Sequence, residues 1–509
     1  MSSAKTYKPG EAILYLIGMF GQNMIYNIIA TGLYFYFQNV ICLDAMALGW
    51  IFAIARVWDA VNDPMMGSIV DKTKTKWGKC RPYLLFAPPF ICIITCITFL
   101  NGNYATAKEN GNSTAMILIV AWAALSYIMW GMSYTVGDIP LWGIISRMSE
   151  VEKDRAKLIS LSRIVASVGA AAVVVSIVAL SQAANDFFGE GKNAQKGFIF
   201  VGIIMTIAAS IMFECAGLGA KERVPAGEER KTMRESIALM WKCRPFRRIL
   251  ISGILRSPMQ LMMIVVVTLF TYYYCDGDLQ LAFKEPKRIV TLLIVGGGYF
   301  AGQFVSMILC PMLIEKMSVK TLYNLSGFAS IPTGLIFVTF LIAPENLMSI
   351  GWVILDGILF LLSGIGFGIV NVTQSIMISD CIDYEEFHNG YRPDGIFFSG
   401  QSFITKLSAG IATIISAFVY KSVGYTDVNI DKMNKALEHG ASFAKDYGEY
   451  SKAMWFILTV PAAIAYAIAV IPTLKYEIST ADHQKMLDAL VARHSKITEN
   501  SSAEKDNEA

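Results

Sequence analysis

Residues 83–101 read YLLFAPPFICIITCITFLN, an apolar run that contains no charged side chain. A helix needs about 20 predominantly apolar residues to cross the roughly 30 Å hydrocarbon core of a bilayer. Runs of this kind recur from residue 12 to residue 474 with short polar breaks between them. Only 16% of the 509 residues are charged, whereas soluble domains carry about a quarter. The sequence therefore predicts an all-α membrane protein that crosses the bilayer many times.

The apolar runs define twelve predicted transmembrane helices. They cover about 12–40, 46–70, 83–101, 115–146, 158–182, 197–220, 249–274, 289–314, 321–343, 350–379, 395–421 and 453–475. The first run is too long for the apolar part of a signal peptide and has no cleavage site, so we interpret it as a helix. The longest early break, 221–248, is rich in Lys and Arg and separates six spans from six.

This layout predicts four regions. They are an N-terminal six-helix bundle (1–220), a central cytoplasmic loop (221–248), a C-terminal six-helix bundle (249–475) and a cytoplasmic tail (476–509). In the tail we expect a short helix from about 480 to 496 and disorder over 500–509. Lys and Arg gather in alternate loops, which predicts a plasma-membrane protein with both termini in the cytoplasm. The same bias explains the basic central loop, so we expect the lipid bilayer as a partner and no nucleic acid.

The second predicted span carries a dense cluster of ionisable residues. Asp59 and Asp63 are four residues apart, so both lie on one helix face. A charge near the bilayer centre costs at least about 2.5 kcal/mol, and such residues usually line an interior cavity. Two carboxylates repel unless a cation lies between them, and Asn62 adds an oxygen donor suited to Na⁺. We interpret this face as a site for Na⁺ or H⁺; alternatively, one Asp pairs with Arg56 or Lys406 and only holds helices together.

The fourth predicted span presents a second polar face. Thr135, Asp138 and Trp142 are spaced three and then four residues apart, which again places them on one side of a helix. A carboxylate can accept two sugar hydroxyls while an indole ring stacks on the apolar face of the sugar. Arg163, in the fifth span, can donate to hydroxyls or neutralise Asp138. The pattern favours a sugar site, and a structural Asp138–Arg163 salt bridge is a compatible alternative.

Lys406 lies deep in the eleventh predicted span, close to Gln401. A buried ammonium group needs an anion. If Lys406 approaches Asp59 and Asp63, the three groups keep one excess negative charge, which a single bound cation would neutralise.

Two further expectations concern the remaining ionisable groups. Arg256 and Asp356 can form a structural pair within the second half of the chain. All four histidines fall outside the membrane interior, so a proton relay through histidine is excluded and carboxylates must carry any coupled proton. These histidines are His388, His439, His483 and His494.

Three motifs together resemble the glycoside–pentoside–hexuronide:cation symporters, the major-facilitator family of the melibiose permease. They are ARVWDAVNDPMMG at 55–67 continued by DKTKTKWGKCRP at 71–82, DIPLW at 138–142, and DCIDYEEF at 380–387. The resemblance extends over the whole twelve-span layout. It implies a major facilitator fold of two six-helix bundles and cation-coupled sugar transport by alternating access.

The resemblance also implies site residues. The cation site would comprise Asp59, Asn62, Asp63 and Thr135 with Lys406 as the coupled lysine, and the sugar site would include Asp138, Trp142 and Arg163. The segments that contain Asp71 and Arg81, and Asp380 and Asp383, resemble the family's cytoplasmic gating loops.

Two positions differ from the melibiose permease. Asn23 replaces an acidic residue and Asn371 replaces an aromatic one, and we count both, with Gln401, as candidate substrate-binding residues. Both differences argue against a galactoside. Losing one anion makes a negatively charged substrate such as a hexuronide easier to admit, while pentosides and neutral glycosides stay equally open.

The sequence therefore predicts a secondary symporter for a sugar or glycoside with Na⁺ or H⁺, functional as a monomer and without a cofactor. If sodium is the coupling ion, Asp59 and Asp63 would bind it. An alternative on the same fold is a cation-coupled transporter of lysolipids or other polar solutes. A more remote one is a non-transporting membrane sensor, although residues 476–509 offer no large domain. No nucleophile–base pair, metal cluster or nucleotide loop points to an enzyme.

Overall fold

The computed structural model describes residues 6–43, 45–190, 194–224, 233–277, 285–425, 429, 432–433, 436–437 and 439–507. Every regular element among these residues is helical, which confirms the predicted all-α class. The chain forms two compact units. Unit 1 comprises Met1–Cys243, Ser379–Phe403 and Ala481–Ala509, and unit 2 comprises Arg244–Ile378 and Ile404–Thr480.

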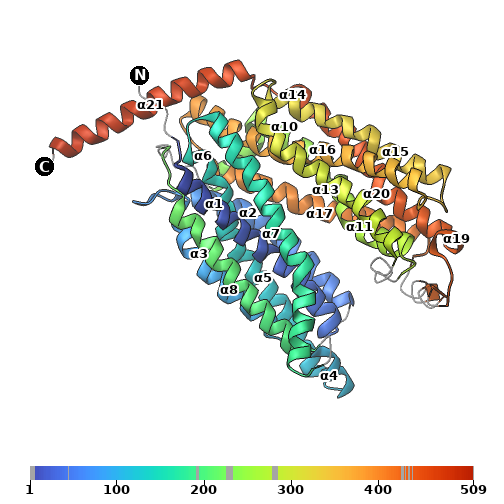
Figure 1. Cartoon of the computed structure of the whole chain (residues 1–509). Coiled ribbons are helices and arrows are strands. Elements are labelled where there is room, and N and C mark those ends of the chain that lie inside the picture. The colour runs from blue at the N-terminus through green and yellow to red at the C-terminus, as the bar shows by residue number, and fades with distance from the viewer. Residues whose placement is uncertain are drawn as a thin grey trace. The chain divides into compact units, whose positions relative to one another are not determined.

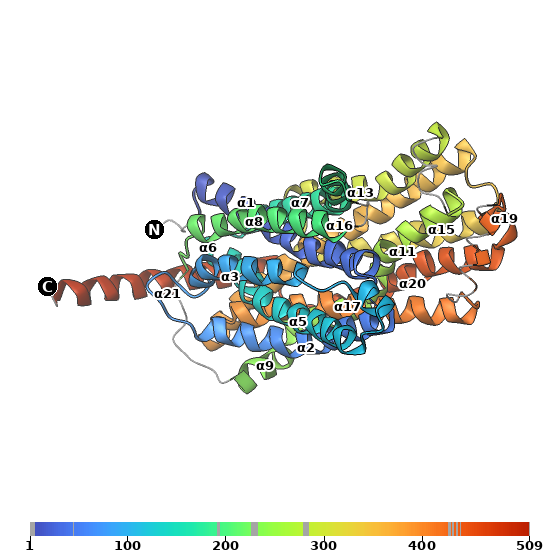
Figure 2. The ribbon, with the colours of Figure 1, turned by 90° about the horizontal axis from the view of Figure 1, so that it is seen from below.

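Unit 1 begins with a long helical segment that consists of α1 and two π-helical stretches, η1 and η2. Its elements are α1 (Pro9–Asn27), η1 (Ile28–Leu33), η2 (Tyr36–Val40), α2 (Ala45–Lys72), α3 (Arg81–Phe99), α4 (Tyr104–Glu109), α5 (Ser113–Gly143), α6 (Ile145–Met148), α7 (Glu152–Phe187), α8 (Gln195–Gly219), α9 (Met233–Lys242) and α21 (Thr480–Asn507). Helix α8 packs against α1 and α3, and α5 packs against α3 and α2 (Figures 1 and 2).

Unit 2 holds the second set of long helices. Its elements are α10 (Arg244–Leu255), η3 (Ser257–Gln260), α11 (Leu261–Leu269), η4 (Phe270–Tyr274), α13 (Pro286–Ile314), α14 (Val319–Leu325), η5 (Ser326–Ala329), α15 (Ser330–Ile342), α19 (Phe443–Asp446) and α20 (Gly448–Leu474). Two helices contribute to both units: α16 (Ile350–Asn389) and α17 (Asp394–Ser422). The predicted bundles are continuous in sequence, whereas unit 1 also takes in the end of α16, the start of α17 and α21.

Ten helices among the described residues are long and apolar enough to cross a membrane. Two predicted spans are not among them. The span 46–70 forms α2, a continuous helix whose charged residues lower its hydropathy. The span 249–274 is divided, because a 3₁₀ turn at Ser257–Gln260 interrupts it at Pro258. With these two segments, the ten helices account for the twelve predicted spans.

Small residues allow the helices to pack closely. A Cβ atom added at Gly21 of α1 would lie 2.3 Å from the carbonyl oxygen of Ala209 in α8, so only glycine fits there. In unit 2, Gly364 of α16 meets the backbone of Tyr299 in α13 at 2.0 Å in the same way. Such contacts are typical of membrane helices, whose association depends on close packing.

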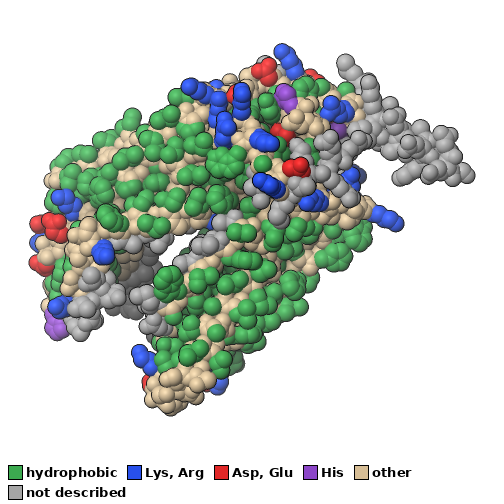
Figure 3. Space-filling model, turned by 180° about the vertical axis from the view of Figure 1, so that it is seen from behind, with side chains coloured by type: hydrophobic (Ala, Val, Ile, Leu, Met, Phe, Trp, Pro, Cys, Tyr) green, Lys and Arg blue, Asp and Glu red, His purple; other side chains and the backbone are tan. Residues whose placement is uncertain are grey.

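Outward-facing side chains on these helices are apolar. On α3, Phe86, Phe90 and Ile93 are 64%, 56% and 58% exposed and recur at helical spacing. Figure 3 shows hydrophobic side chains over the flanks of the helices and charged side chains gathered toward helix ends. A broad exposed apolar surface marks a helix built for a hydrocarbon environment.

The predicted pair of Arg256 and Asp356 does not form. Arg256 bonds with Gln374 and with the hydroxyl of Tyr323 at 2.8 Å. Asp356 instead accepts a hydrogen bond of 2.7 Å from Thr339. The two residues therefore have different partners, because their helices present them to different neighbours.

The tail is also more helical than expected, since α21 continues to Asn507 through residues predicted to be disordered. Residues 225–232 of the predicted central loop lie outside the described part of the chain.

Candidate functional site

The two aspartates of α2 lie against α5 inside unit 1. Asp63 is fully buried; its Oδ1 accepts a hydrogen bond of 3.1 Å from Thr135 and its Oδ2 one of 3.0 Å from Ser402 of α17. Asp59 lies one turn earlier, and its Oδ1 is 3.4 Å from the position that a Cβ atom would take at Gly131. The structure thus brings together Asp59, Asp63 and Thr135, as the sequence predicts.

Asn62 precedes Asp63 in α2. Its side chain is buried, and its Nδ2 has no hydrogen-bond partner among the described residues. A buried amide nitrogen without a hydrogen-bond partner is energetically costly. Ser402, whose hydroxyl reaches Asp63, was missed because a single serine in an apolar helix carries no distinct signal.

Lys406 follows Ser402 by one turn of α17 and belongs to unit 2. Its side chain is half-buried. The predicted charge balance between Lys406 and the two aspartates stays a prediction. The alternative partner, Arg56, has a side chain outside the described part of the structure.

The predicted sugar-site residues of α5 and α7 also lie together. The guanidinium carbon of Arg163 is 4.1 Å from the centre of the Trp142 ring, a cation–π contact. Asp138 and Trp142 are each 9% exposed. Stacking on the indole holds the guanidinium of Arg163 in place over one face of the Trp142 ring.

Gln22 of α1 binds Asp138. Its Nε2 donates to Asp138 Oδ1 at 2.7 Å and also contacts the hydroxyl of Tyr134. Asn23, the predicted substrate ligand, donates to Gln22 Oε1 at 2.6 Å and to the carbonyl of Met19 at 3.1 Å. Gln22 therefore reaches the site directly and Asn23 acts on it through Gln22. The sequence-based prediction selected Asn23 and not Gln22, because spacing alone does not tell which of two adjacent amides faces α5.

Three aromatic rings pack together beside Gln22, which contacts the hydroxyl of Tyr134. Trp130 and Tyr134 are stacked with ring centroids 5.0 Å apart, and Tyr26 lies 5.7 Å from Tyr134. Trp130 Nε1 is buried and has no hydrogen-bond partner among the described residues. Aromatic faces of this kind suit the C–H face of a sugar ring. These rings were not predicted, since aromatic residues are common in membrane helices.

The two remaining predicted substrate residues lie on other helices. Gln401 is buried on the part of α17 that belongs to unit 1, and Asn371 is half-buried on α16 in unit 2. Their contact with a substrate stays a prediction.

The predicted gating residue Asp71 caps a helix. Its two carboxylate oxygens accept hydrogen bonds of 2.8 and 2.9 Å from the backbone N–H groups of Gly395 and Ile396, in the first turn of α17. A carboxylate is favourable there because the N-terminus of a helix carries partial positive charge.

Arg81 binds the C-terminal end of a helix. Its Nε donates at 3.0 Å to the carbonyl of Gly217, in the last turn of α8. Glu222, which was not predicted, accepts from the backbone N–H groups of Cys80 and Arg81 at 2.7 and 3.0 Å and pairs with Arg147 at 2.5 Å.

The other gating residues belong to a buried cluster that we call the ionic network. Its members are Arg147, Glu150, Glu152, Arg155, Asp380, Asp383, Glu386, Arg392, Asp394, His483 and His494. Asp383 accepts a bidentate pair of bonds from Arg155 at 3.1 and 2.6 Å and a third bond of 3.1 Å from Arg392. Sequence reasoning identified Asp380 and Asp383 but not their partners.

Arg392 is the centre of the ionic network. It pairs with Asp383 and Asp394 at 3.1 Å and also with Glu386, and its Nη2 donates to the carbonyl of Ser146. Burial alone would lower the pKa of Arg392, but the carboxylates around it raise that pKa. The side chain therefore stays a buried cation held by three anions.

Two histidines attach α21 to the ionic network. His494 contacts Glu386 at 2.8 Å and Glu150 at 3.4 Å. Burial tends to lower the pKa of His494, and the hydrogen bonds to these carboxylates raise it above the usual value.

His483 contacts Asp383 at 3.2 Å and Glu152 at 3.4 Å. Burial opposes its protonation, but Asp380, Asp383 and Glu152 raise the pKa of His483 to about 10. Both histidines had been assigned no role from sequence.

The chain resembles known transport proteins along most of its length. The family model "MFS/sugar transport protein" matches residues 14–480. The isoprimeverose transporter of Lactiplantibacillus pentosus is 26% identical, with 82% of this chain and 80% of that protein aligned. The glucuronide carrier protein homolog of Escherichia coli K12 is 23% identical, over 81% and 83% of the two chains.

Solved structures support the fold. A bacterial homologue of the iron transporter ferroportin superposes with a TM-score of 0.59 at 13% identity, covering 91% of this chain and 98% of that one. The E. coli fucose:proton symporter FucP gives 0.58 at 12% identity, covering 92% and 98%. At such low identity these matches establish the fold alone, and they confirm the predicted major facilitator architecture. The chain is a multi-pass membrane protein that belongs to the MFS/sugar transport family, within the glycoside–pentoside–hexuronide:cation symporters.

Proposed function

We propose that this protein takes up a sugar or glycoside together with Na⁺ or H⁺ by alternating access. In this proposal Asp59, Asp63, Asn62 and Thr135 form the cation site. Asp138, Trp142, Arg163 and Gln22 bind the sugar, with Asn23, Gln401 and Asn371 as further candidates. Lys406 is the proposed counter-charge of the cation site.

One observation carries the proposal: helix α5 presents both groups of residues. Thr135 bonds to Asp63 at 3.1 Å, and three residues later Asp138 bonds to Gln22 at 2.7 Å. Less than one helical turn separates the two positions. A cation that orders Thr135 therefore also orders the backbone that holds Asp138.

This arrangement accounts for coupling. If the cation raises the affinity for the sugar, the sugar must raise the affinity for the cation by the same factor. Carboxylate, hydroxyl and amide oxygens are the ligands that a hard cation such as Na⁺ prefers. If H⁺ is the coupling ion, Asp59 or Asp63 would carry it, because no histidine lies within the described site.

The substrate class follows from the groups that face it. Asp138 can accept hydroxyl protons, Trp142 and the aromatic rings can stack on the sugar, and Arg163 can attract an anionic substituent. Neutral glycosides, pentosides and hexuronides are therefore the classes to test. The relatives named for isoprimeverose and for glucuronide support this range.

The remaining features of the proposal concern placement. We place the ionic network and both termini in the cytoplasm of a plasma-membrane protein, since Lys and Arg gather on that side. There Asp71, Arg81, Asp380 and Asp383 would serve as gate residues. We further propose that the protein works as a monomer in the lipid bilayer, without enzymatic activity or a cofactor, in keeping with a family of transporters.

Uptake into membrane vesicles tests the proposal. A panel of labelled glycosides, pentosides and hexuronides would be supplied with and without Na⁺ and a pH gradient. We expect one class to accumulate only with one cation. Asp63→Asn should weaken the apparent cation affinity by about 10–100-fold and Asp138→Asn should abolish solute binding, whereas Glu109→Gln, at an exposed position, should behave as wild type. Unchanged uptake in both site variants would refute the assignment.

A further inference from the structure

A pocket of about 370 Å³ lies at the turn that joins α2 to α3 in unit 1. Pockets of roughly 300 Å³ and more hold small ligands. Among the described residues, five cationic side chains and one carboxylate line it: Lys74, Lys76, Lys79, Arg147, Arg223 and Glu222. Because α2 and α3 both cross the bilayer, the turn between them lies at a membrane surface. The transport proposal does not use this pocket.

The turn is held in one conformation by Glu222. Its carboxylate accepts hydrogen bonds of 3.0, 2.7 and 3.0 Å from the backbone N–H groups of residues 79–81. Gly78 has a φ of +111°, and a Cβ atom added there would lie 2.3 Å from Glu222 Oε1, so the position requires glycine. The hydroxyl of Thr75 closes the turn by donating to the carbonyl of Gly78 at 2.8 Å. The wall of the pocket is therefore formed by the chain itself.

Three of the five cations have anions within the chain. Arg147 pairs with Glu222 at 2.5 Å, and Arg223 pairs with Glu11 at 2.6 Å. Lys79 is buried near a carboxylate of the ionic network. These three side chains are already compensated, so they give the pocket its shape but little excess charge.

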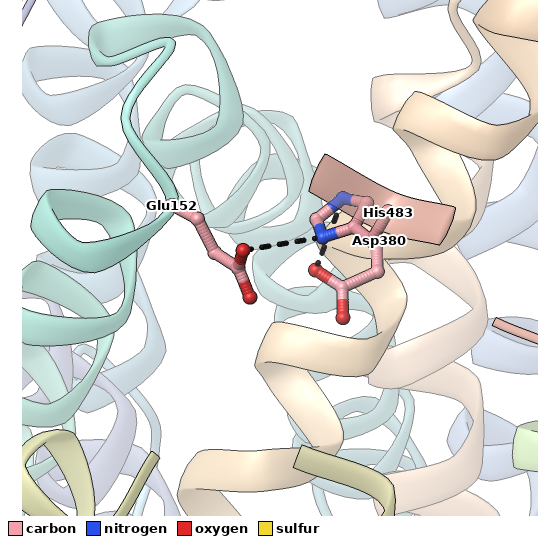
Figure 4. A group of neighbouring side chains, drawn as sticks. All are labelled: Glu152, Asp380 and His483. Atoms are coloured by element: carbon pink, nitrogen blue, oxygen red, sulfur yellow. Dashed lines mark ion pairs between the residues drawn. The ribbon is translucent and has the colours of Figure 1, made fainter. Parts of the chain in front are cut away.

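The two other cations differ from the rest of this region. In the ionic network even His483 has its own anions, since it lies between the carboxylates of Asp380 and Glu152 at 3.7 and 3.4 Å (Figure 4). Lys74 and Lys76, in contrast, are exposed and form no ion pair within the described part of the chain. The pocket therefore carries two uncompensated positive charges, which an anion from outside the chain can neutralise.

Trp77 connects the pocket with the lipid-facing side of α3. Its side chain is 51% exposed, and its ring centroid lies 5.9 Å from that of Phe86. Phe86 belongs to the exposed apolar face of α3, together with Phe90 and Ile93. Tryptophan is enriched where the hydrocarbon core of a membrane meets water. The aromatic edge of the pocket thus adjoins the surface that acyl chains cover.

We propose that this pocket binds the headgroup of an anionic phospholipid. Lys74 and Lys76 would bind its phosphate, and its acyl chains would run along Phe86 and Phe90. Basic pockets at the ends of membrane helices recognise anionic headgroups in this way. A zwitterionic lipid carries a positive charge of its own, which the two lysines repel. A soluble phosphate ester lacks the chains that would cover the apolar face of α3, so the contact between Trp77 and Phe86 favours a lipid.

Bound lipid should stabilise this part of unit 1. Any ligand that binds only the folded arrangement stabilises it by mass action. The turn lies between Asp71 and Arg81, two of the proposed gate residues, so the lipid would hold the segment on which both depend. An anionic phospholipid should therefore raise the melting temperature of the protein in detergent more than a zwitterionic one does.

The test uses the full-length protein, delipidated in a neutral detergent, and native mass spectrometry to count bound lipids. Phosphatidylglycerol and phosphatidylcholine with the same acyl chains are titrated separately. We expect one phosphatidylglycerol per chain to bind more tightly than any phosphatidylcholine. The double variant Lys74→Gln/Lys76→Gln should bind it about 30-fold more weakly, since each basic residue at a membrane surface contributes about fivefold.

Two further double variants separate a site from a general effect of charge. Lys316→Gln/Lys485→Gln removes the same charge at exposed positions outside the pocket and should bind as wild type. Lys74→Arg/Lys76→Arg keeps both charges and should retain the affinity. Equal binding of the two lipids, or an equal loss of affinity in the control variant, would overturn the proposal.

Two additional measurements test the position and the source of the phosphate. Phosphatidylglycerol with brominated chains should quench tryptophan fluorescence less in Trp77→Phe than in wild type, and equal quenching would place the lipid elsewhere. Glycerol 3-phosphate should compete poorly with the lipid. If it bound as tightly as phosphatidylglycerol, the ligand would be a soluble phosphate ester and the proposal would be wrong. No sugar is present in these experiments, so the transport proposal is tested separately.

Discussion

Two polar regions of unit 1 satisfy their charges in different ways. In the site between α2 and α5, Asp63 accepts hydrogen bonds from two neutral hydroxyls, those of Thr135 and Ser402. In the ionic network, Asp383 accepts bonds from two guanidinium groups, Arg155 and Arg392. Hydroxyl oxygens can also coordinate a cation, whereas guanidinium groups cannot. The first region therefore has the ligand groups for the cation that we propose, and the second is held together by its own charges.

The comparison leads us to expect opposite responses to mutation. Loss of a charge from the ionic network should mainly affect stability, because a buried partner is left uncompensated. Loss of a charge from the α2–α5 site should mainly affect transport.

The largest expected effect is that of Arg392→Gln. This change leaves Asp383, Glu386 and Asp394 buried without their shared cation. Removing one partner of a buried ion pair costs about 3–5 kcal/mol, so the melting temperature in detergent should fall sharply. Arg244→Gln, at an exposed position, is the control. Equal melting temperatures for the two variants would show that the network adds little stability.

Asp63→Asn should have the next largest effect. A hydrogen bond to a charged group contributes about 1.5–3 kcal/mol, which corresponds to about 10–100-fold weaker apparent cation affinity. The melting temperature should stay close to that of the wild type. Cation-dependent uptake and thermal unfolding measure the two quantities. If Asp63→Asn lowered the melting temperature as much as Arg392→Gln and kept the wild-type cation response, the α2–α5 site would serve stability and not transport.

Gln22→Met should have a smaller and more selective effect. Removing the donor to Asp138 should raise the apparent sugar KM by about tenfold, the equivalent of about 1.4 kcal/mol. Cation affinity at saturating sugar should change little. Gln38→Met, at an exposed position of η2, should change neither quantity. A shift in cation affinity without a shift in KM would place Gln22 in the cation site instead.

The smallest expected effect concerns pH and His494. Its pKa is raised in the folded protein, where Glu150 and Glu386 face it and Arg392 opposes them. The docking of α21 therefore has its full histidine contribution below the usual pKa of about 6.5 and loses it as pH rises through the raised value. Hydrogen-exchange protection of α21, corrected for intrinsic rates, should decrease accordingly. In His494→Gln this part of the pH dependence should vanish; if it persists unchanged, another group is responsible.

The fold was predictable because each membrane-spanning helix needs its own apolar run of about 20 residues, and such a run can be recognised from the sequence alone. Residues 83–101 form α3 as expected, and Phe86, Phe90 and Ile93 mark its exposed apolar face. The interruption of the span 249–274 at Pro258 in η3 was not predicted, because the apolar run continues across it. The span 46–70 forms the predicted helix α2, although its carboxylates lower the mean hydropathy of that helix.

The candidate site was predictable to the extent that it depends on spacing along one helix. Asp59 and Asp63 share a face of α2, and Thr135 and Asp138 share a face of α5, because the helical repeat requires it. The choice of Gln22 over Asn23 required the packing of α1 against α5.

The sequence by itself determined the membrane class, the span layout and the residues that carry charge into the spans, because bilayer thickness and helical periodicity act locally. The tertiary structure alone decided which distant groups meet. Ser402 reaches Asp63, and His483 and His494 of α21 join carboxylates of α7 and α16. Such contacts depend on how the helices pack against one another, and residue spacing along one helix does not predict that packing.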